Sequence, residues 1–372
     1  MNTPSFSLSL PSTYQSMQFY APYDVRYESV ALPTLQSGEV LVRIGTALTC
    51  GTDLKCYRRG HPVLLGQLPS PFGHEFAGTV AAVAEDVTQW QVGDRVVAVN
   101  SAPCGECFYC QKQQPNLCET LVLLNGAYAD YIVVPANIAK INMHRLPETL
   151  PFEVAAFTEP LAVAMRGVLD MGLQAGDHIA IIGVGPIGQL MVKVASLSGF
   201  KVTVLARNEA KLAMARRFGG AIATVNIANG IDAPHIVAQY SPEGRGFDAV
   251  IEAVGLPEVW ESCVSLVRRG GKVHWFAGCA GGSTITLETR RLHYDEITLY
   301  SLFHHTPAFV KQAFDWLATG FLDPTPLITD TLPLPQLETA LQQMQAGQGF
   351  KYALVPEASS PHASVPPTLT EA

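Results

Sequence analysis

Four cysteines fall within one short stretch of this chain, at Cys104, Cys107, Cys110 and Cys118. The spacing C-x2-C-x2-C-x7-C brings four thiols close enough for tetrahedral thiolate coordination, which is the geometry of closed structural zinc sites. Glycine and proline interrupt the segment, as is typical of a turn-rich loop. The alternative interpretation is a set of unrelated free thiols or two disulfides. We predict one structural zinc ion that holds this loop together.

The chain has 372 residues, of which 48% are hydrophobic, and this is enough to form two domains with separate cores. Its formal net charge of -8 and scattered Lys and Arg residues indicate neither a nucleic-acid partner nor an anionic membrane surface. We find no apolar run long enough to span a bilayer and no secretory signal pattern. Together with the predicted thiolate site, this suggests a cytoplasmic protein that acts on small molecules.

The hydrophobic pattern changes once along the chain. Residues 17–160 contain short β-branched runs at 39–44, 78–83 and 95–99 between Gly and Pro turns, which predicts a β-rich domain. Residues 161–303 alternate apolar strands with helical stretches, which predicts an α/β domain with a doubly wound parallel sheet. Its five expected strands are 178–182, 201–205, 247–251, 272–276 and 297–303.

We make separate predictions for the segments outside these two domains. Residues 304–356 contain two helical patterns and a closing strand at 351–355, which we expect to pack on the first domain. Residues 1–16 and 357–372 are rich in proline and small polar residues, and these segments bury too little apolar surface to offset the entropy of ordering. We predict that both are disordered.

A glycine-rich turn follows the strand expected at 178–182. The sequence is Gly183-Val-Gly185-Pro186-Ile187-Gly188, with a helical pattern from Gln189 onward. Strand, glycines and helix in this order are the context that the dinucleotide fingerprint requires, because the pyrophosphate binds at the helix N-terminus. The alternative is a glycine-rich turn that binds no ligand. We predict that the segment Gly183, Gly185, Pro186, Ile187 and Gly188 binds NAD or NADP.

The end of the second expected strand bears on the choice between these two coenzymes. An acidic residue usually stands there in NAD sites and binds the ribose 2′-hydroxyl, but this chain has Ala206, Arg207 and Asn208. A guanidinium group is well shaped to pair with a 2′-phosphate. The sequence therefore favours NADP, with Ala206 and Arg207 at the site. An exposed arginine with relaxed coenzyme choice is the alternative.

A second constellation of metal-binding residue types lies in the β-rich domain. Cys50 and Thr52 follow one expected strand, His74 and Glu75 follow the next turn-rich stretch, and Glu159 begins a helix. One thiolate, one imidazole and one or two carboxylates form an incomplete protein shell, which leaves zinc a position for water or substrate. Taken singly, a cysteine or histidine is more often a core or structural residue. The combination predicts a catalytic zinc site.

The motifs C-G-T-D, G-H-E-F-A-G, G-D-R-V, the four-cysteine lobe, E-P-L-A and G-V-G-P-I-G occur here in one order. In this the chain resembles the zinc-dependent medium-chain alcohol dehydrogenases, most closely their sorbitol and polyol branch, over roughly residues 17–356. The resemblance implies a GroES-like catalytic domain, a Rossmann domain, two zinc ions per chain and a homodimer or homotetramer. It also implies that Cys50 and His74 bind the catalytic zinc, with Glu75 or Glu159 as the third ligand.

The resemblance further implies a mechanism. A hydride would pass between the carbinol carbon and the nicotinamide, while Thr52 takes the alcohol proton and Asp53 orients His74. Many relatives have a histidine where this chain has Lys55, so the later members of the proton relay stay open, with His61 as one candidate. His304 and His305 would contact the substrate, or they only end a strand.

Three functions remain open at this point. The first is a zinc-dependent dehydrogenase that interconverts a secondary alcohol, such as a polyol, sugar or cyclitol, and its ketone with NAD(P). The second is an NADPH-dependent carbonyl reductase, and the third is a non-catalytic nucleotide-binding zinc protein. The substrate class follows from the resemblance alone, because a fold does not fix its function.

Overall fold

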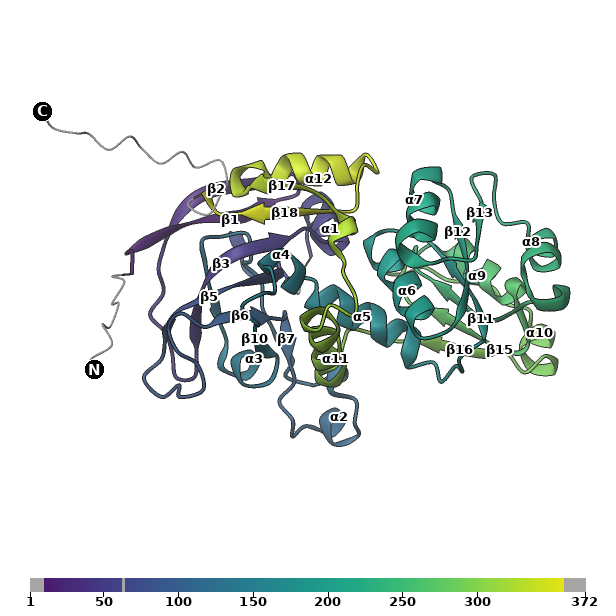
Figure 1. The fold of residues 1–372 in the computed structure, drawn as a ribbon, viewed down its shortest axis with the longest axis horizontal. Helices are drawn as coiled ribbons and strands as arrows, with labels where there is room; N and C mark the ends of the chain where they lie inside the picture. The colour runs from purple at the N-terminus through teal and green to yellow at the C-terminus, as the bar shows by residue number, and fades with distance from the viewer. Residues whose placement is uncertain (1–9, 62–63, 358–372) are drawn as a thin grey trace, which may run out of the picture. The chain divides into compact units, whose positions relative to one another are not determined.

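The computed structural model describes residues 10–61 and 64–357. It divides into two compact units, one formed by Met1–Thr158 with Phe314–Ala372 and the other by Glu159–Ala313 (Figure 1). The predicted boundary near residue 160 lies close to the observed one. The second boundary lies at Ala313 rather than at 303, because the first part of the helix after His305 belongs to the second unit.

The first unit is rich in antiparallel strands. Its largest sheet has the order β10-β6-β5-β3-β18-β17, with β9 also paired to β3, and a smaller sheet has the order β2-β1-β4. The strands are β1 Thr13–Ala21, β2 Asp24–Ala31, β3 Val40–Leu48, β4 Ser70–Pro71, β5 Glu75–Val83, β6 Arg95–Ala98, β7 Ser101–Ala102, β8 Val122–Leu123, β9 Tyr131–Val134, β10 Met143–Arg145, β17 Ile328–Pro333 and β18 Lys351–Val355. The helices are α1 Gly51–Arg59, α2 Phe108–Gln111, α3 Ala136–Ile141, α4 Phe152–Ala155 and α12 Leu337–Gln345, with the short turns η1 Pro115–Leu117, η4 Thr325–Leu327 and η5 Leu334–Gln336.

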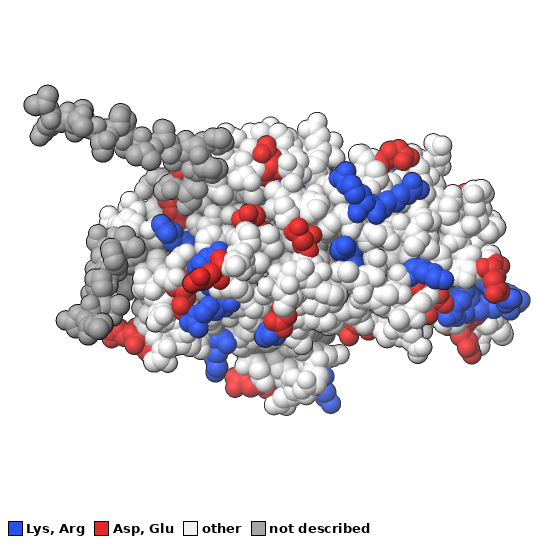
Figure 2. Space-filling view, in the orientation of Figure 1, with Lys and Arg blue, Asp and Glu red and all other residues white. Residues whose placement is uncertain are grey.

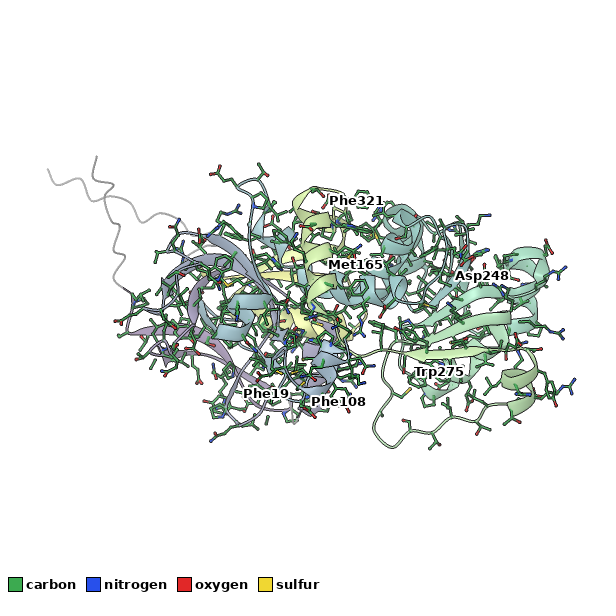
Figure 3. The ribbon with its side chains drawn as sticks, turned by 90° about the horizontal axis from the view of Figure 1, so that it is seen from below. Phe19, Phe108, Met165, Asp248, Trp275 and Phe321 are labelled. Atoms are coloured by element: carbon green, nitrogen blue, oxygen red, sulfur yellow. The ribbon has the colours of Figure 1, made fainter. Side chains whose placement is uncertain are left out.

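Strand β3 lies at the centre of this unit because its apolar residues are buried on both faces. It pairs with β5, β9 and β18, so that segments far apart in the sequence meet along one strand. Glycine is required at position 78 of β5, where this strand pairs with β3, since a Cβ there would lie 2.1 Å from the Arg43 carbonyl oxygen. Phe19 of β1 belongs to the same buried core (Figure 3).

The second unit is a six-stranded parallel sheet of order β13-β12-β11-β14-β15-β16. Numbered within the unit this order is 3-2-1-4-5-6, the doubly wound arrangement of dinucleotide-binding folds. Its strands are β11 His178–Ile182, β12 Lys201–Ala206, β13 Ala223–Asn226, β14 Phe247–Glu252, β15 Val267–Trp275 and β16 Thr298–Ser301. Its helices are α5 Thr158–Leu169, α6 Pro186–Leu197, α7 Glu209–Met214, η2 Ala215–Gly219, α8 Ala233–Tyr240, η3 Pro242–Gly244, α9 Pro257–Leu266 and α10 Thr289–Tyr294, and α11 Pro307–Ala318 crosses the boundary between the units.

The sequence pattern explains this sheet. All five residues of β11 are buried, as expected of a central parallel strand that helices cover on both faces. The sheet has one strand more than the five that we predicted, because the weakly apolar β13 at its edge is only partly buried. Trp275 at the end of β15 stacks on Trp260, with ring centroids 4.8 Å apart (Figure 3).

The predicted disorder of residues 1–16 is wrong for its last part. Strand β1 begins at Thr13 and pairs with β2 through eight register positions, which supplies the hydrogen bonds that a disordered segment would lack. Residues 1–9 and 358–372 lie outside the described part of the chain, so the prediction for them stays a prediction. Glu357 is described and follows β18 after Pro356.

Candidate active site and coenzyme site

Cys50 stands at the junction of a strand and a helix in the first unit. It caps the N-terminus of α1, where its Sγ accepts a hydrogen bond from the Thr52 backbone N–H at 3.4 Å. The Asp53 carboxylate completes a capping box, because it accepts a hydrogen bond from the Cys50 N–H at 3.0 Å. The local sequence thus fixes the Cys50 sulfur at the N-terminus of α1.

His74 is fixed by the same carboxylate. Its Nδ1 lies 3.0 Å from Asp53 Oδ1, and the buried Tyr128 hydroxyl also donates to Asp53. Burial alone would lower the pKa of His74, but the charges of Asp53 and Cys50 together raise it well above the ordinary value. Because Nδ1 is engaged, Nε2 is the nitrogen that is left to bind a metal. The structure shows the contact that we predicted between Asp53 and His74.

Glu75 begins β5 and is fully buried. Its Oε2 accepts from Lys351 Nζ at 2.5 Å, while no residue that the structure describes contacts its buried Oε1 through a hydrogen bond. Burial raises the pKa of this carboxyl, and the Lys351 ammonium opposes that shift. A buried carboxylate oxygen without a hydrogen-bond donor is costly, and a bound cation or a proton removes this cost.

Cys50, His74 and Glu75 form one cluster, in which the three ligand atoms all lie within 4.8 Å of one another. One sulfur, one nitrogen and one oxygen ligand suit a zinc ion that keeps a position open for substrate. The donor set and the orphaned Oε1 therefore both fit the catalytic zinc. Thr52, half-buried in the first turn of α1, lies two residues from Cys50.

The four clustered cysteines come together around the short helix α2. Cys104, Cys107, Cys110 and Cys118 place their sulfurs within 4.8 Å of one another. All four are free thiols, and the Cys104 and Cys110 sulfurs lie 4.0 Å apart, far beyond a disulfide bond. The backbone N–H groups of Glu106 and Cys107 donate to the Cys104 sulfur and lower the pKa of Cys104 to about 6. Such N–H donors stabilise thiolates, so the loop fits the structural zinc.

The glycine-rich turn of the second unit lies between β11 and α6. Gly183 has a φ of 94°, and a Cβ on Gly188 would lie 2.1 Å from the Gly183 carbonyl oxygen. By contrast, a Cβ on Gly185 would meet no atom within 4 Å. Gly183 and Gly188 are thus needed for the turn and for packing, while Gly185 leaves space beside the N-terminus of α6. Pro186 begins this helix, and Ile187 follows it.

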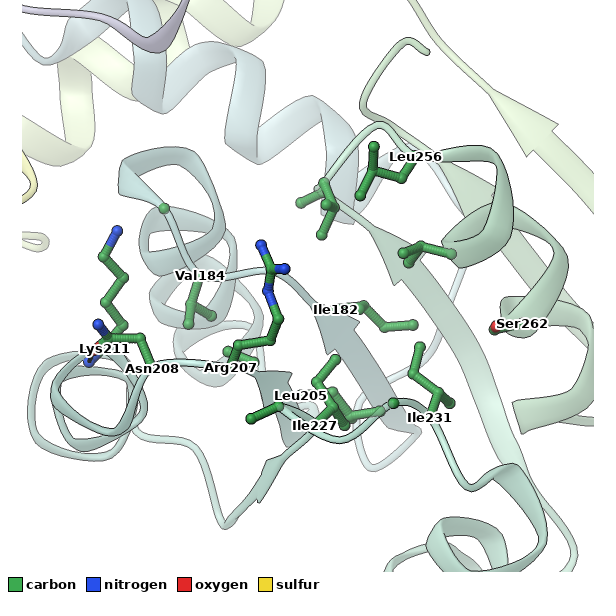
Figure 4. Close-up of a pocket in the computed structure, with 18 of the residues that line it drawn as sticks. Ile182, Val184, Leu205, Arg207, Asn208, Lys211, Ile227, Ile231, Leu256 and Ser262 are labelled. Atoms are coloured by element: carbon green, nitrogen blue, oxygen red, sulfur yellow. Dashed lines mark hydrogen bonds between the residues drawn. The ribbon is translucent and has the colours of Figure 1, made fainter. Parts of the chain in front are cut away.

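A pocket of about 580 Å³ opens at the carboxyl ends of β11 and β12, which is a volume typical of ligand sites. Figure 4 shows Ile182, Ile227 and Ile231 on one side of it, and Arg207 and Lys211 on the other. Burial lowers the pKa of Lys211. Ala206 and Asn208 also line the pocket. The pocket therefore combines an apolar surface with two cationic groups.

A third cluster lies within the second unit. Glu159 in the first turn of α5 and the consecutive His304 and His305 place their ligand atoms within 4.8 Å of one another. Burial, His304 and Arg166 hold the pKa of His305 well below its ordinary value. The structure thus groups Glu159 with two histidines of the second unit, and Cys50, His74 and Glu75 form a different group.

Comparisons with known proteins agree with this geometry. Residues 36–147 match the model of the alcohol dehydrogenase GroES-like domain, and residues 186–319 match that of the zinc-binding dehydrogenases. The L-threonine 3-dehydrogenase of Bacillus velezensis is 31% identical over 88% of this chain and 94% of its own length. The chain belongs to the zinc-dependent medium-chain alcohol dehydrogenase family.

This dehydrogenase is also similar to two further proteins. The sorbitol dehydrogenase of Bacillus subtilis is 29% identical over 90% of this chain and 94% of its own length. A putative zinc-binding dehydrogenase from Sinorhizobium meliloti, solved with NADP, has a TM-score of 0.84 at 27% identity and covers 93% of this chain and 100% of its own. The enzyme is thus similar to dehydrogenases of a polyol and of a hydroxyl-bearing amino acid.

Two residues of the dehydrogenase site were not predicted from its sequence. Tyr128 and Lys351 lie far along the chain from the residues that they contact, and neither belongs to a motif that marks it.

Lys55 is exposed, and the His61 Nδ1 accepts from the Leu64 N–H at 3.1 Å. This hydrogen bond favours the interpretation of His61 as a loop residue.

The surface of the enzyme carries both signs of charge. In Figure 2, acidic side chains lie among the basic ones on the face shown. Among the described residues, no helix is long and apolar enough to cross a bilayer.

Proposed function

We propose that this dehydrogenase interconverts a polyhydroxylated secondary alcohol and its ketone, with NADP preferred over NAD. The observation that carries the proposal is the cluster of Cys50, His74 and Glu75 ligand atoms within 4.8 Å, beside Thr52. Polyols, sugars and cyclitols are the substrate class, and the similarity to a sorbitol dehydrogenase supports this choice.

Cys50 and His74 would hold the catalytic zinc, with a carboxylate as the third ligand. When bound, zinc supplies Lewis-acid polarisation of the alcohol oxygen. Asp53 keeps His74 Nδ1 protonated and so directs Nε2 into the site. When bound, the nicotinamide would supply the hydride acceptor. The Thr52 hydroxyl would accept the alcohol proton and give up its own proton toward solvent.

Glu75 and Glu159 are the two candidates for the third ligand. The orphaned Oε1 of Glu75, in one cluster with Cys50 and His74, supports Glu75. We expect Glu75→Gln to weaken zinc binding at this site by at least about tenfold, and Glu159→Gln to leave it unchanged. Zinc retention against a chromophoric chelator measures both effects. The opposite result would assign Glu159.

The dinucleotide would lie in the pocket of the second unit, with its pyrophosphate at Gly185 and the N-terminus of α6. Arg207 and Lys211 would pair with the 2′-phosphate of NADP, since both line the pocket beyond the end of β12. The structure of an NADP-bound relative at 27% identity is consistent with this coenzyme.

A second candidate substrate is L-threonine or a similar hydroxyl-bearing amino acid, because a threonine dehydrogenase is 31% identical to this chain. Threonine also carries a secondary alcohol, so the same chemistry would serve. Physiological reduction of a carbonyl compound with NADPH remains the alternative direction of the proposed reaction.

Initial rates test these proposals directly. The zinc-loaded enzyme would be assayed with polyols, aldoses, cyclitols, L-threonine and simple alcohols, with NADP and NAD in parallel, and the corresponding ketones with NADPH. We expect the highest kcat/KM for a polyhydroxylated substrate with NADP, and no turnover by Cys50→Ser. A higher kcat/KM for simple alcohols or threonine would reject the polyol proposal. NADPH binding without any turnover, at full zinc loading, would indicate a non-catalytic binding protein.

The proposal extends to assembly and location. We propose a homodimer or homotetramer, since closed symmetric assemblies are common among soluble enzymes. We also propose a cytoplasmic location, because thiolate clusters persist where thiols stay reduced. Light scattering after size exclusion would test the first, and cell fractionation the second.

A further inference from the structure

A buried arginine of the second unit donates hydrogen bonds to the loop that follows β16. Arg166 lies on α5 and is 9% exposed. Its Nη1 donates to the carbonyl oxygens of Phe303 at 2.8 Å and of His304 at 2.9 Å, and its Nε lies 3.4 Å from Asp170 Oδ2. We propose that Arg166 is a positioning residue of the dehydrogenase, which sets the conformation of this loop and thereby the placement of His304 and His305.

The loop is held in a conformation that costs free energy. His304 has a φ of 66°, in the left-handed region that a residue with a side chain rarely adopts. Consecutive side chains of an extended strand point to opposite faces, but the ring centroids of His304 and His305 lie only 3.9 Å apart. The carbonyl groups of Phe303 and His304 also converge on one nitrogen of Arg166. Such a conformation persists where surrounding contacts stabilise it.

Arg166 supplies contacts of this kind. A guanidinium group forms charge-assisted hydrogen bonds, which are stronger than those between neutral groups, and burial strengthens them further. The Phe303 side chain is 62% exposed, so packing of this residue in the core does not anchor the loop. Conversely, the buried guanidinium needs acceptors, and the two carbonyl oxygens and Asp170 provide them. The arginine and the loop thus stabilise each other.

A second contact ties the same helix to β16. Asp170 follows the last residue of α5, and its Oδ2 accepts a hydrogen bond from the Tyr300 hydroxyl of β16 at 3.1 Å. Arg166 and Asp170 therefore contact both the end of this strand and the loop after it. Together these hydrogen bonds fix the position of the loop relative to α5.

The same helix carries Glu159, which connects the loop to the candidate site residues. Glu159 precedes Arg166 by about two helical turns, so both side chains lie on one face of α5. Its ligand atom lies with those of His304 and His305 within 4.8 Å of one another. Imidazole nitrogens donate or accept hydrogen bonds, which suits the hydroxyl groups of a sugar or polyol. The role of Arg166 in turnover rests on the proposed function, in which the enzyme binds such a substrate.

Steady-state kinetics of Arg166→Ala measures this role. We expect kcat/KM for the polyhydroxylated substrate to fall by at least about tenfold, as when a group that orients a ligand is lost. The Kd for NADP should stay unchanged, since the described residues that line the coenzyme pocket do not include Arg166. Guanidinium chloride, far below the concentrations that unfold proteins, should restore part of the lost kcat/KM, and sodium chloride at equal concentration should not. General damage to the fold would show no such rescue.

Arg268→Ala is the matched control. Arg268 also pairs with a carboxylate, since its Nε lies 2.6 Å from Asp248 Oδ1, and its Nη1 donates to the Arg269 carbonyl oxygen at 2.8 Å. This substitution should leave kcat/KM unchanged with and without guanidinium. Arg166→Lys keeps the charge but lacks the planar fork, so its loss of kcat/KM should be smaller than that of Arg166→Ala. Circular dichroism verifies folding, and the lysine variant carries the test if the alanine variant does not fold.

Crystal structures of the unmodified enzyme and of the folded Arg166 variant test the loop without any assay. In the variant, we expect His304 to leave the left-handed region and the two imidazole rings to separate beyond 3.9 Å. Unchanged loop geometry would overturn the proposal, as would an unchanged kcat/KM or an equal loss of NADP affinity. If the unmodified enzyme turned over no polyhydroxylated substrate, the proposed function would fail, and the loop geometry alone would decide the positioning role of Arg166.

Discussion

Lys351 Nζ lies 2.5 Å from Glu75 Oε2, and the two side chains are 1% and 0% exposed. Lys351 also donates to the Thr49 carbonyl oxygen at 2.8 Å, at the end of β3. The last strand of the first unit thereby supplies a cation to a carboxylate beside Cys50 and His74. A buried ion pair of this kind adds little net stability, but removal of one partner leaves an uncompensated charge.

Lys351→Met should therefore destabilise the enzyme. We expect the free energy of unfolding to fall by about 3–5 kcal/mol, because Glu75 would then be buried without a counter-charge. Urea denaturation of the metal-free protein measures this loss. The double variant Lys351→Met with Glu75→Gln should recover part of it, since it removes the unpaired charge. Equal stability of Lys351→Met and the unmodified protein would contradict this role of the ion pair.

Gly185 and Gly188 should respond differently to alanine. Gly188→Ala places a methyl group 2.1 Å from the Gly183 carbonyl oxygen, so we expect both a lower melting temperature and weaker coenzyme binding. Gly185→Ala meets no protein atom within 4 Å and should keep the melting temperature while it weakens coenzyme binding. Thermal melts and coenzyme titrations test the pair. Unchanged affinity in Gly185→Ala would show that the dinucleotide does not approach this residue.

Arg207 should determine much of the preference for NADP. We expect Arg207→Ala to raise the KM for NADP by about 10–100-fold, the equivalent of one charge-assisted hydrogen-bonded pair, and to leave that for NAD unchanged. Steady-state kinetics with both coenzymes measures this selectivity. Arg245→Ala, at an exposed arginine outside the pocket, is the control. An equal rise for both coenzymes would mean that Arg207 does not contact the 2′-phosphate.

The preference for NADP should also depend on pH through Lys211. Burial lowers the pKa of Lys211, and the side chain is cationic only below that pKa. As the pH rises, its positive charge is lost before that of an ordinary lysine, whose pKa is about 10.4. The ratio of kcat/KM for NADP to that for NAD should therefore begin to fall at a lower pH than it would with an ordinary lysine. Lys211→Met should flatten this profile, and a profile unaffected by the substitution would reject the role.

Asp94 should stabilise the first unit above acidic pH. Burial opposes its charged form, but hydrogen bonds from Arg145, whose Nη2 lies 2.5 Å away, and from the Gln91 N–H lower the pKa of Asp94. A folded-state pKa below the unfolded value stabilises the protein above about pH 4, and this contribution is lost as the pH falls through the folded-state pKa. Because Arg145 is 55% exposed, we expect Asp94→Asn to cost only about 1 kcal/mol at pH 7. The two proteins should converge in stability near pH 3, and a constant difference would contradict the linkage.

The four-cysteine loop should need its metal for structure rather than for chemistry. Cys107→Ser should release one zinc ion per chain and lower the melting temperature, because the loop around α2 loses a ligand. Residual activity per catalytic zinc should stay close to that of the unmodified enzyme. Zinc analysis together with calorimetry measures the change. Full zinc content in this variant would show that Cys107 is not a ligand.

Local patterns were sufficient to predict much of this enzyme. The four cysteines lie within fifteen residues of one another, and the glycine-rich turn follows its strand directly, so nearby residues determine both sites. Strands β11 and β18 have the bounds that we predicted, and all five positions of each are buried. Strand β13 and the β1–β2 hairpin carry weaker patterns, because their residues are only partly buried or are buried through pairing with other strands.

The sequence by itself thus predicted two sets of zinc-ligand residue types and the dinucleotide turn, and it identified the family. The tertiary structure decided which carboxylate shares a cluster with which ligands. Glu75 lies with Cys50 and His74 and is paired with Lys351, while Glu159 lies with His304 and His305. These contacts join segments up to 276 residues apart, and they depend on strand pairing and loop conformation. Sequence spacing cannot encode such contacts, because only the folded chain brings distant side chains into one buried site.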